Sequence, residues 1–177
     1  MKRRTAIRNL VIISAGTAFL PGCNNSGIAA IPLKNIEVSN KEQNMLAQLC
    51  ETIIPKTKNF IGAKDLKSHQ FLLIMIDDCS SPEEQKIFVS GLQVFDKLSH
   101  DKFGQIFTAC TADQKKSLLT AIENKKDVPA DALQFYATVK RYTLQSFTTC
   151  KEYMVDIKKY KMIPGPNFKG CVQVKNV

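Results

Sequence analysis

The stretch SPEEQKIFVSGLQVFDKL at residues 81–98 decides the fold class of this chain. Ser81 suits the N-cap of a helix, Pro82 suits its first position, and Glu84 completes a capping box with the serine. Apolar side chains then recur at the spacing of one helical face, at Phe88, Leu92, Phe95 and Leu98. The segment therefore predicts an amphipathic helix with one buried face.

Similar signals occur on both sides of this helix. Ser39 with Glu42 precedes one apolar stripe, which stops at Pro55 and places Cys50 toward the core. Thr111 with Gln114 precedes a second stripe. The members of the two stripes are Met45, Leu46, Leu49, Cys50 and Ile53, and Leu118, Leu119 and Ile122. Apolar content predicts two further helices, over about residues 64–79 and 129–154.

No stretch alternates apolar and polar residues between turn signals, which argues against a sizeable sheet. We therefore expect an all-α protein, with a single compact helical domain of about five helices. Residues 162–171 are rich in proline and glycine and predict an irregular C-terminal arm. This arm is interpreted as a docking arm, or as a segment that folds back so that Phe168 covers the core. In the first case the partner-interface residues are Pro164, Gly165, Phe168, Gly170 and Cys171.

The first 22 residues have the pattern of an export signal. Four basic residues and no acid precede an apolar run that ends at Pro21, and the run is too short to span a membrane comfortably. Arg3 and Arg4 resemble a twin-arginine signal, which is read by a translocase for folded proteins, although an ordinary basic start is the alternative. The sequence Leu20-Pro21-Gly22-Cys23 resembles a lipobox, in which Cys23 would be lipidated; a structural cysteine is the alternative.

These features predict three segments: an export signal peptide at 1–22, a flexible tether at 23–39 and a helical domain at 40–177. The expected location is the periplasm or cell envelope, with the chain anchored to a membrane through lipidated Cys23. Removal of residues 1–22 would take four of the 25 basic residues and lower the net charge from +9 to +5. The remaining excess is scattered lysine, which argues against a nucleic-acid partner and suits an anionic lipid surface, an acidic partner or plain solvation.

The sequence contains no recognisable catalytic, cofactor-binding or metal-binding motif. It lacks a dinucleotide-binding glycine fingerprint, a phosphate-binding loop and a nucleophile elbow. His69 and His100 are isolated from other ligands and are interpreted as structural or exposed residues. The six cysteines are widely spaced and suit an oxidising compartment, and lipidation of Cys23 would leave an odd number.

The order of several segments resembles a known family. The sequence LAQLCETIIPKT at residues 46–57 is followed by Gly62-Ala63, then by a segment with Phe103 that leads into the Gln114 helix. An aromatic helix over 135–147 and a Pro-Gly, aromatic, Gly-Cys ending follow. Together they resemble the gluconate 2-dehydrogenase subunit 3 family over about residues 45–172. The chain departs from the family pattern at Ile61, where proline is usual, and at residues 146–150, where the family has an aromatic-Thr-Ser-x-x-Gly segment.

The resemblance implies a non-catalytic accessory subunit of a periplasmic FAD-dependent sugar or alcohol dehydrogenase of the glucose-methanol-choline type. It implies that the large partner subunit carries the FAD, that this chain binds no cofactor, and that it aids the export, stability and membrane placement of the partner. A cytochrome c is the candidate electron acceptor. The odd cysteine count makes Cys150 or Cys171 a candidate for an interchain disulfide. The alternative function is a freestanding helical envelope lipoprotein that binds proteins and has no redox partner.

Overall fold

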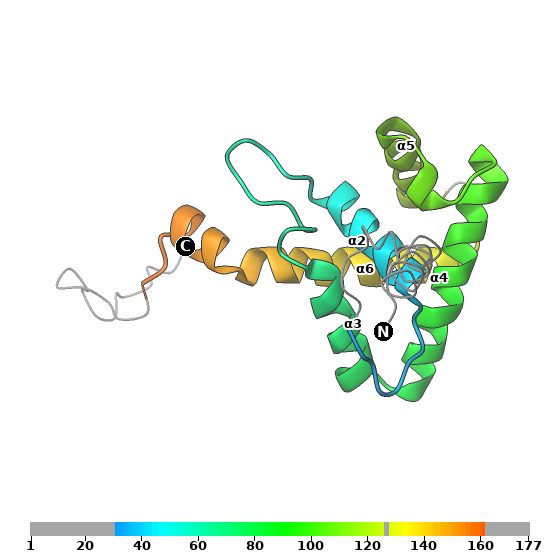
Figure 1. Ribbon diagram of the computed structural model, residues 1–177, viewed down its shortest axis with the longest axis horizontal. Coiled ribbons are helices and arrows are strands. Elements are labelled where there is room, and N and C mark those ends of the chain that lie inside the picture. The colour runs from blue at the N-terminus through cyan, green and yellow to red at the C-terminus, as the bar shows by residue number, and fades with distance from the viewer. Residues whose placement is uncertain (1–30, 126–127, 162–177) are drawn as a thin grey trace, which may run out of the picture.

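The computed structural model describes residues 31–125 and 128–161 (Figure 1). The helices in these ranges are α2 (Asn40–Ile53), α3 (Ser68–Cys79), α4 (Pro82–Phe103), α5 (Ala112–Glu123) and α6 (Ala130–Thr149). A 3₁₀ turn, η1 (Phe107–Ala109), precedes α5, and a π-helical turn, η2 (Tyr153–Ile157), follows α6. Neither described range contains a strand, so the prediction of an all-α helical domain is confirmed.

The predicted capping boxes start three of these helices. In each box the N-cap hydroxyl accepts the backbone N–H of the third helical residue, and that residue's side chain accepts the N-cap N–H at 2.8–2.9 Å. The pairs are Ser39 with Glu42, Ser81 with Glu84, and Thr111 with Gln114. Gly104, with a φ of +70°, ends α4 in the left-handed conformation that glycine adopts without strain.

Helix α6 passes through the middle of the bundle and packs mainly against α4 and α3 (Figure 1). Phe135 of α6 lies 5.3 Å from Phe88 and 5.4 Å from Phe95, measured between ring centroids, so the two predicted core phenylalanines of α4 form one cluster with Phe135. Cys50 is buried as predicted, and the Thr143 hydroxyl donates a hydrogen bond to its sulfur at 3.2 Å. Burial raises the pKa of the Cys50 thiol to about 11, so this sulfur is a core atom rather than a nucleophile.

Residues 31–39, the described part of the expected tether, pack against the helical bundle. Ile36 is only 7% exposed, and the backbone N–H groups of Lys34, Asn35 and Ile36 all donate to the Asp77 carboxylate of α3. The Gln43 side chain also bonds to the backbone of Ile31. Ile36 is therefore buried against the bundle. The Asp77 carboxylate supplies the hydrogen bonds that the three backbone N–H groups would otherwise make to water. Residues 23–30 lie outside the described residues.

Two helix ends differ from the sequence prediction. Helix α3 begins at Ser68 rather than near residue 64, because Lys67 has a φ of +54° and the Lys64 N–H bonds to Glu51 instead. Helix α6 ends at Thr149 rather than near residue 154. The hydroxyls of Thr148 and Thr149 bond back to carbonyl groups of their own helix, a pattern that competes with regular continuation.

His69 of α3 is 1% exposed, and neither of its ring nitrogens has a hydrogen-bond partner among the described residues. Burial, with smaller contributions from the charges of Lys64 and Lys67, lowers the pKa of His69 from 6.5 to about 4. The folded state therefore requires the neutral ring, whereas the unfolded chain accepts a proton near its ordinary pKa.

We expect the free energy of unfolding to have its full value above pH 6.5 and to decrease as the pH falls toward 4. Over this range the unfolded state binds a proton on His69 that the folded state does not bind. The loss should be on the order of 3 kcal/mol. Urea titrations between pH 4.5 and 7.5 on wild type and His69→Leu measure it. The variant should be less acid-sensitive, while the exposed control His100→Gln should follow wild type. Parallel pH curves for wild type and His69→Leu would contradict this assignment.

Candidate partner-binding surface

A loop between α2 and α3, residues 54–67, projects from the bundle beside α6 (Figure 1). Glu51, near the end of α2, holds both sides of this loop. One oxygen of its carboxylate accepts the Lys56 N–H and the other accepts the Lys64 N–H, each at 2.8 Å. Ala63 donates its N–H to the Ile54 carbonyl at 3.0 Å and closes the base. Since these are charge-assisted bonds to backbone groups, they determine the path of the loop.

Gly62 is required by this arrangement. A Cβ atom at Gly62 would lie 2.6 Å from both carboxylate oxygens of Glu51 and 2.6 Å from the Lys56 nitrogen. The family-like stretch from Glu51 to Ala63 thus forms one structural unit, in which an acid and a side-chain-free residue meet across the loop. The Lys56–Asp65 ion pair at 2.7 Å is exposed and adds little stability.

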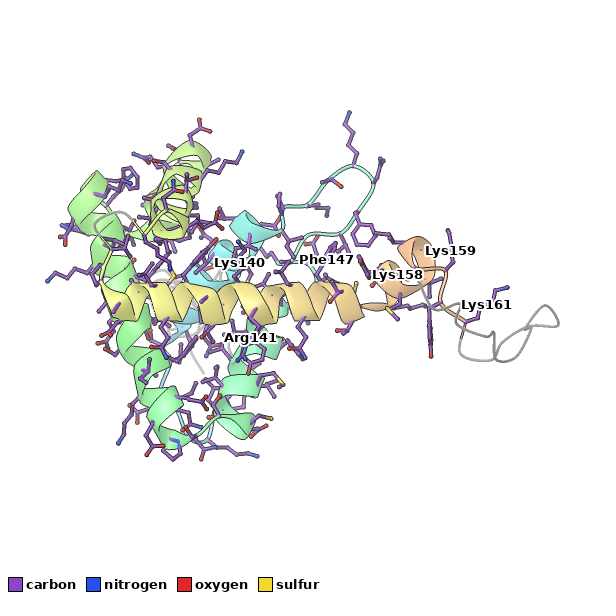
Figure 2. The ribbon with its side chains drawn as sticks, turned by 180° about the vertical axis from the view of Figure 1, so that it is seen from behind. Lys140, Arg141, Phe147, Lys158, Lys159 and Lys161 are labelled. Atoms are coloured by element: carbon purple, nitrogen blue, oxygen red, sulfur yellow. The ribbon has the colours of Figure 1, made fainter. Side chains whose placement is uncertain are left out.

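The tip of the loop contacts the far end of α6 through aromatic rings. Phe60 lies 5.1 Å from Phe147, and Phe147 lies 5.5 Å from Tyr153 of η2, measured between ring centroids. Figure 2 shows Phe147 on the part of α6 that extends toward the projecting end. The stack therefore supports the chain after α6, where regular helix has stopped.

The chain beyond this stack exposes apolar and cationic side chains together. We name residues 153–161, with the stack residues Phe60 and Phe147, the terminal platform. Val155, Ile157 and Tyr160 are 48%, 52% and 55% exposed. Lys158, Lys159 and Lys161 lie at the same projecting end (Figure 2). Exposed apolar side chains grouped in this way are typical of a protein-interaction surface.

The sequence analysis did not identify this platform, although it contained a signal. Three lysines, at 158, 159 and 161, follow or flank Val155, Ile157 and Tyr160 within seven residues after a helix end, which is unusual for a purely solvated turn. The predicted export and lipidation residues and the predicted arm residues all lie outside the described residues. They are Arg3, Arg4, Cys23, Pro164, Gly165, Phe168, Gly170 and Cys171.

Cys150 follows the last residue of α6 and is half-buried, and its sulfur accepts a long contact of 3.4 Å from the Tyr153 N–H. The four described cysteines are free thiols: Cys50, Cys79, Cys110 and Cys150. Cys79, at the end of α3, is the exposed thiol of this set.

The described residues provide no group of three metal-ligating side chains. Across residues 31–125 and 128–161, none of the helices has the length and apolar character needed to cross a membrane. Two carboxylates, Glu51 and Asp77, each accept more than one backbone N–H bond and act as structural anchors.

The family model for gluconate 2-dehydrogenase subunit 3 matches residues 40–165. No curated protein and no solved structure matches the chain. The matched range starts at the first residue of α2 and includes the Glu51 loop, α6 and the described platform. Because this range covers more than half of the chain, the protein belongs to the gluconate 2-dehydrogenase subunit 3 family.

Proposed function

We propose that this protein is the non-catalytic accessory subunit of an FAD-dependent sugar or alcohol dehydrogenase and binds the flavoprotein subunit through the terminal platform. Membership of a family of dehydrogenase subunits supports the general role. The observation that carries the proposal is the platform itself, where three large apolar side chains project about half-exposed from the bundle next to three lysines.

The platform is suited to a partner because it is held in place before binding. The Glu51 bonds determine the loop, the loop places Phe60 on Phe147, and Phe147 supports Tyr153. A preorganised surface loses less conformational entropy on association than a flexible one. A partner bound in this way is stabilised by mass action, since the unfolded flavoprotein does not bind.

The proposal includes export and membrane placement. Arg3 and Arg4 would direct the folded complex to the twin-arginine translocase, and lipidated Cys23 would hold it at the envelope near an electron acceptor such as a cytochrome c. The basic start, the apolar run and the Leu20-Pro21-Gly22-Cys23 motif support this part. FAD would be bound by the large subunit.

Affinity purification of the full tagged chain from envelope extracts tests the proposal. We expect a flavoprotein to co-purify, seen as flavin absorbance in the eluate. The double variant Val155→Ser/Ile157→Ser should lower its yield at least tenfold, because two interface side chains lose their apolar contact.

The matched control is Ile74→Ser/Ile87→Ser, which removes two exposed isoleucines from α3 and α4. It should retain wild-type recovery, and thermal melts should show that all variants fold. Purification of wild type without flavin would reject the dehydrogenase role and favour a freestanding lipoprotein. Equal loss in both double variants would reject the platform as the binding surface.

A further inference from the structure

A groove of about 400 Å³ lies between α2, the projecting loop and the start of α5. Gln48, Glu51 and Thr52 line it from α2, Pro55 and Lys64 from the loop, and Ala112, Lys115 and Lys116 from α5. Methyl and methylene groups supply most of its wall, and three ammonium groups surround it. The volume falls within the range of protein ligand sites.

The charges of the groove are unbalanced. Its one carboxylate, Glu51, is already engaged on both oxygens by the backbone N–H groups of Lys56 and Lys64. In the described part of the chain, the ion pairs within 4.0 Å involve Lys56 and Lys140, so none of the groove lysines has a carboxylate partner there. The groove therefore presents a net positive charge to whatever enters it.

Lys115 is the most constrained of these lysines. Its ammonium donates to the Gln48 amide oxygen at 2.7 Å and lies 5.4 Å from the centroid of the Phe107 ring. Burial, opposed by Cys110 and assisted by the nearby charge of Lys64, lowers its pKa below the ordinary lysine value. An anion bound between Lys64 and Lys115 would relieve this desolvation and repulsion.

We propose that the groove binds an acidic segment of a partner polypeptide, with side-chain carboxylates held by Lys64, Lys115 and Lys116 and the intervening chain packed on Pro55 and Thr52. A polypeptide is favoured because the groove and the terminal platform share one loop: Pro55 and Lys64 lie on the same loop as Phe60, which stacks on Phe147. A partner seated on the platform therefore contacts the tip of the loop whose base lines the groove. In this sense the inference rests on the proposed function and specifies the chemistry of the partner segment.

Fluorescence anisotropy on the full chain in mild detergent tests the chemistry directly. The probe is a fluorescein-labelled decapeptide of alternating Glu and Ala, and its control has Gln in place of each Glu. We expect the Glu peptide to bind at least tenfold more tightly at low salt and to weaken as salt is raised. Lys64→Gln/Lys116→Gln should weaken binding of the Glu peptide three- to tenfold.

The matched control, Lys86→Gln/Lys102→Gln, removes two exposed lysines of α4 and should leave the affinity unchanged. Equal affinity for the two peptides, or equal losses in the two double variants, would overturn the inference. Two displacement results would also overturn it. Displacement of the labelled peptide by millimolar phosphate would indicate a small-anion site. Displacement by phosphatidylglycerol vesicles but not by excess unlabelled peptide would indicate a lipid site.

Recovery of flavoprotein from envelope extracts separates this inference from the proposed function. If wild type recovers flavoprotein and Lys64→Gln/Lys116→Gln recovers the same amount, the groove inference fails while the proposed function stands. If wild type recovers none, the proposed function fails, and with it the assignment of the groove to that partner. Reduced recovery in the groove variant alone supports the inference.

Discussion

Replacing Gly91 with leucine is expected to abolish the cooperative unfolding transition of this protein. Gly91 lies where α4 crosses α6, and an added Cβ would lie 2.6 Å from the Phe135 Cβ and 2.8 Å from the Asp131 carbonyl oxygen. Helices α4 and α6 would have to move apart, because the Asp131 carbonyl oxygen belongs to the backbone and cannot rotate away as a side chain can. With a typical total stability of about 5–15 kcal/mol, a separation of the central helix pair leaves little folded protein.

The smaller change Gly91→Ala provides a graded measurement. Alanine favours helix by about 1 kcal/mol over glycine, but the close contacts should outweigh this and give a net loss of about 1–3 kcal/mol. Urea unfolding followed by circular dichroism measures both variants. Ser90→Ala, at the exposed neighbouring position on α4, is the control and should change stability by less than about 0.5 kcal/mol. Gly91→Ala with wild-type or higher stability would mean that the two helices can move apart at small cost.

Replacing Asp77 with alanine is expected to lower the free energy of unfolding by about 2–4 kcal/mol and to release residues 31–38 from the bundle. The carboxylate accepts the N–H groups of Lys34, Asn35 and Ile36 at 2.9, 2.7 and 3.0 Å, and the last of these bonds is buried. Alanine would leave the Ile36 N–H without an acceptor in an apolar environment. Hydrogen exchange at these three amides should accelerate most.

Asp78→Ala is the matched control, because it removes the adjacent but exposed carboxylate of the same helix. It should leave both stability and amide exchange near wild type. Burial raises the pKa of Asp77, but the three N–H bonds and the charge of Lys34 more than offset this, so the pKa lies below its ordinary value. The stabilisation should therefore be present above the ordinary aspartate pKa and disappear only as the pH falls through the lowered value. Unchanged exchange at the Ile36 amide in Asp77→Ala would show that apolar packing alone holds the segment.

Much of the local structure could be predicted because its causes lie close together in the sequence. A capping serine and its glutamate are three residues apart, so Ser81 and Glu84 locate a helix start without any tertiary information. The three-to-four spacing of Phe88, Leu92 and Phe95 likewise identified a buried face. The order of such motifs also supported the family assignment, which the family model confirms.

The site depends on contacts between distant residues, which spacing does not reveal. Asp77 followed the pattern of an ordinary acid at a helix end, yet it is the acceptor for backbone groups more than 40 residues earlier in the chain. For the same reason the prediction of a tether at residues 23–39 did not include the contacts that residues 34–36 make with Asp77. Polarity and lack of period describe a segment without regular structure, but they do not show whether its backbone finds a partner.

The sequence alone determined the helical class, the positions of the main capped helices, and the family, because periodicity and capping are properties of neighbouring residues. Only the tertiary structure decided that Glu51 and Gly62 together shape the projecting loop, that Phe60 stacks on Phe147 to support the terminal platform, and that three lysines from two elements surround one groove. These features exist only when helices pack, since burial and close approach determine which of many possible long-range partners each group meets.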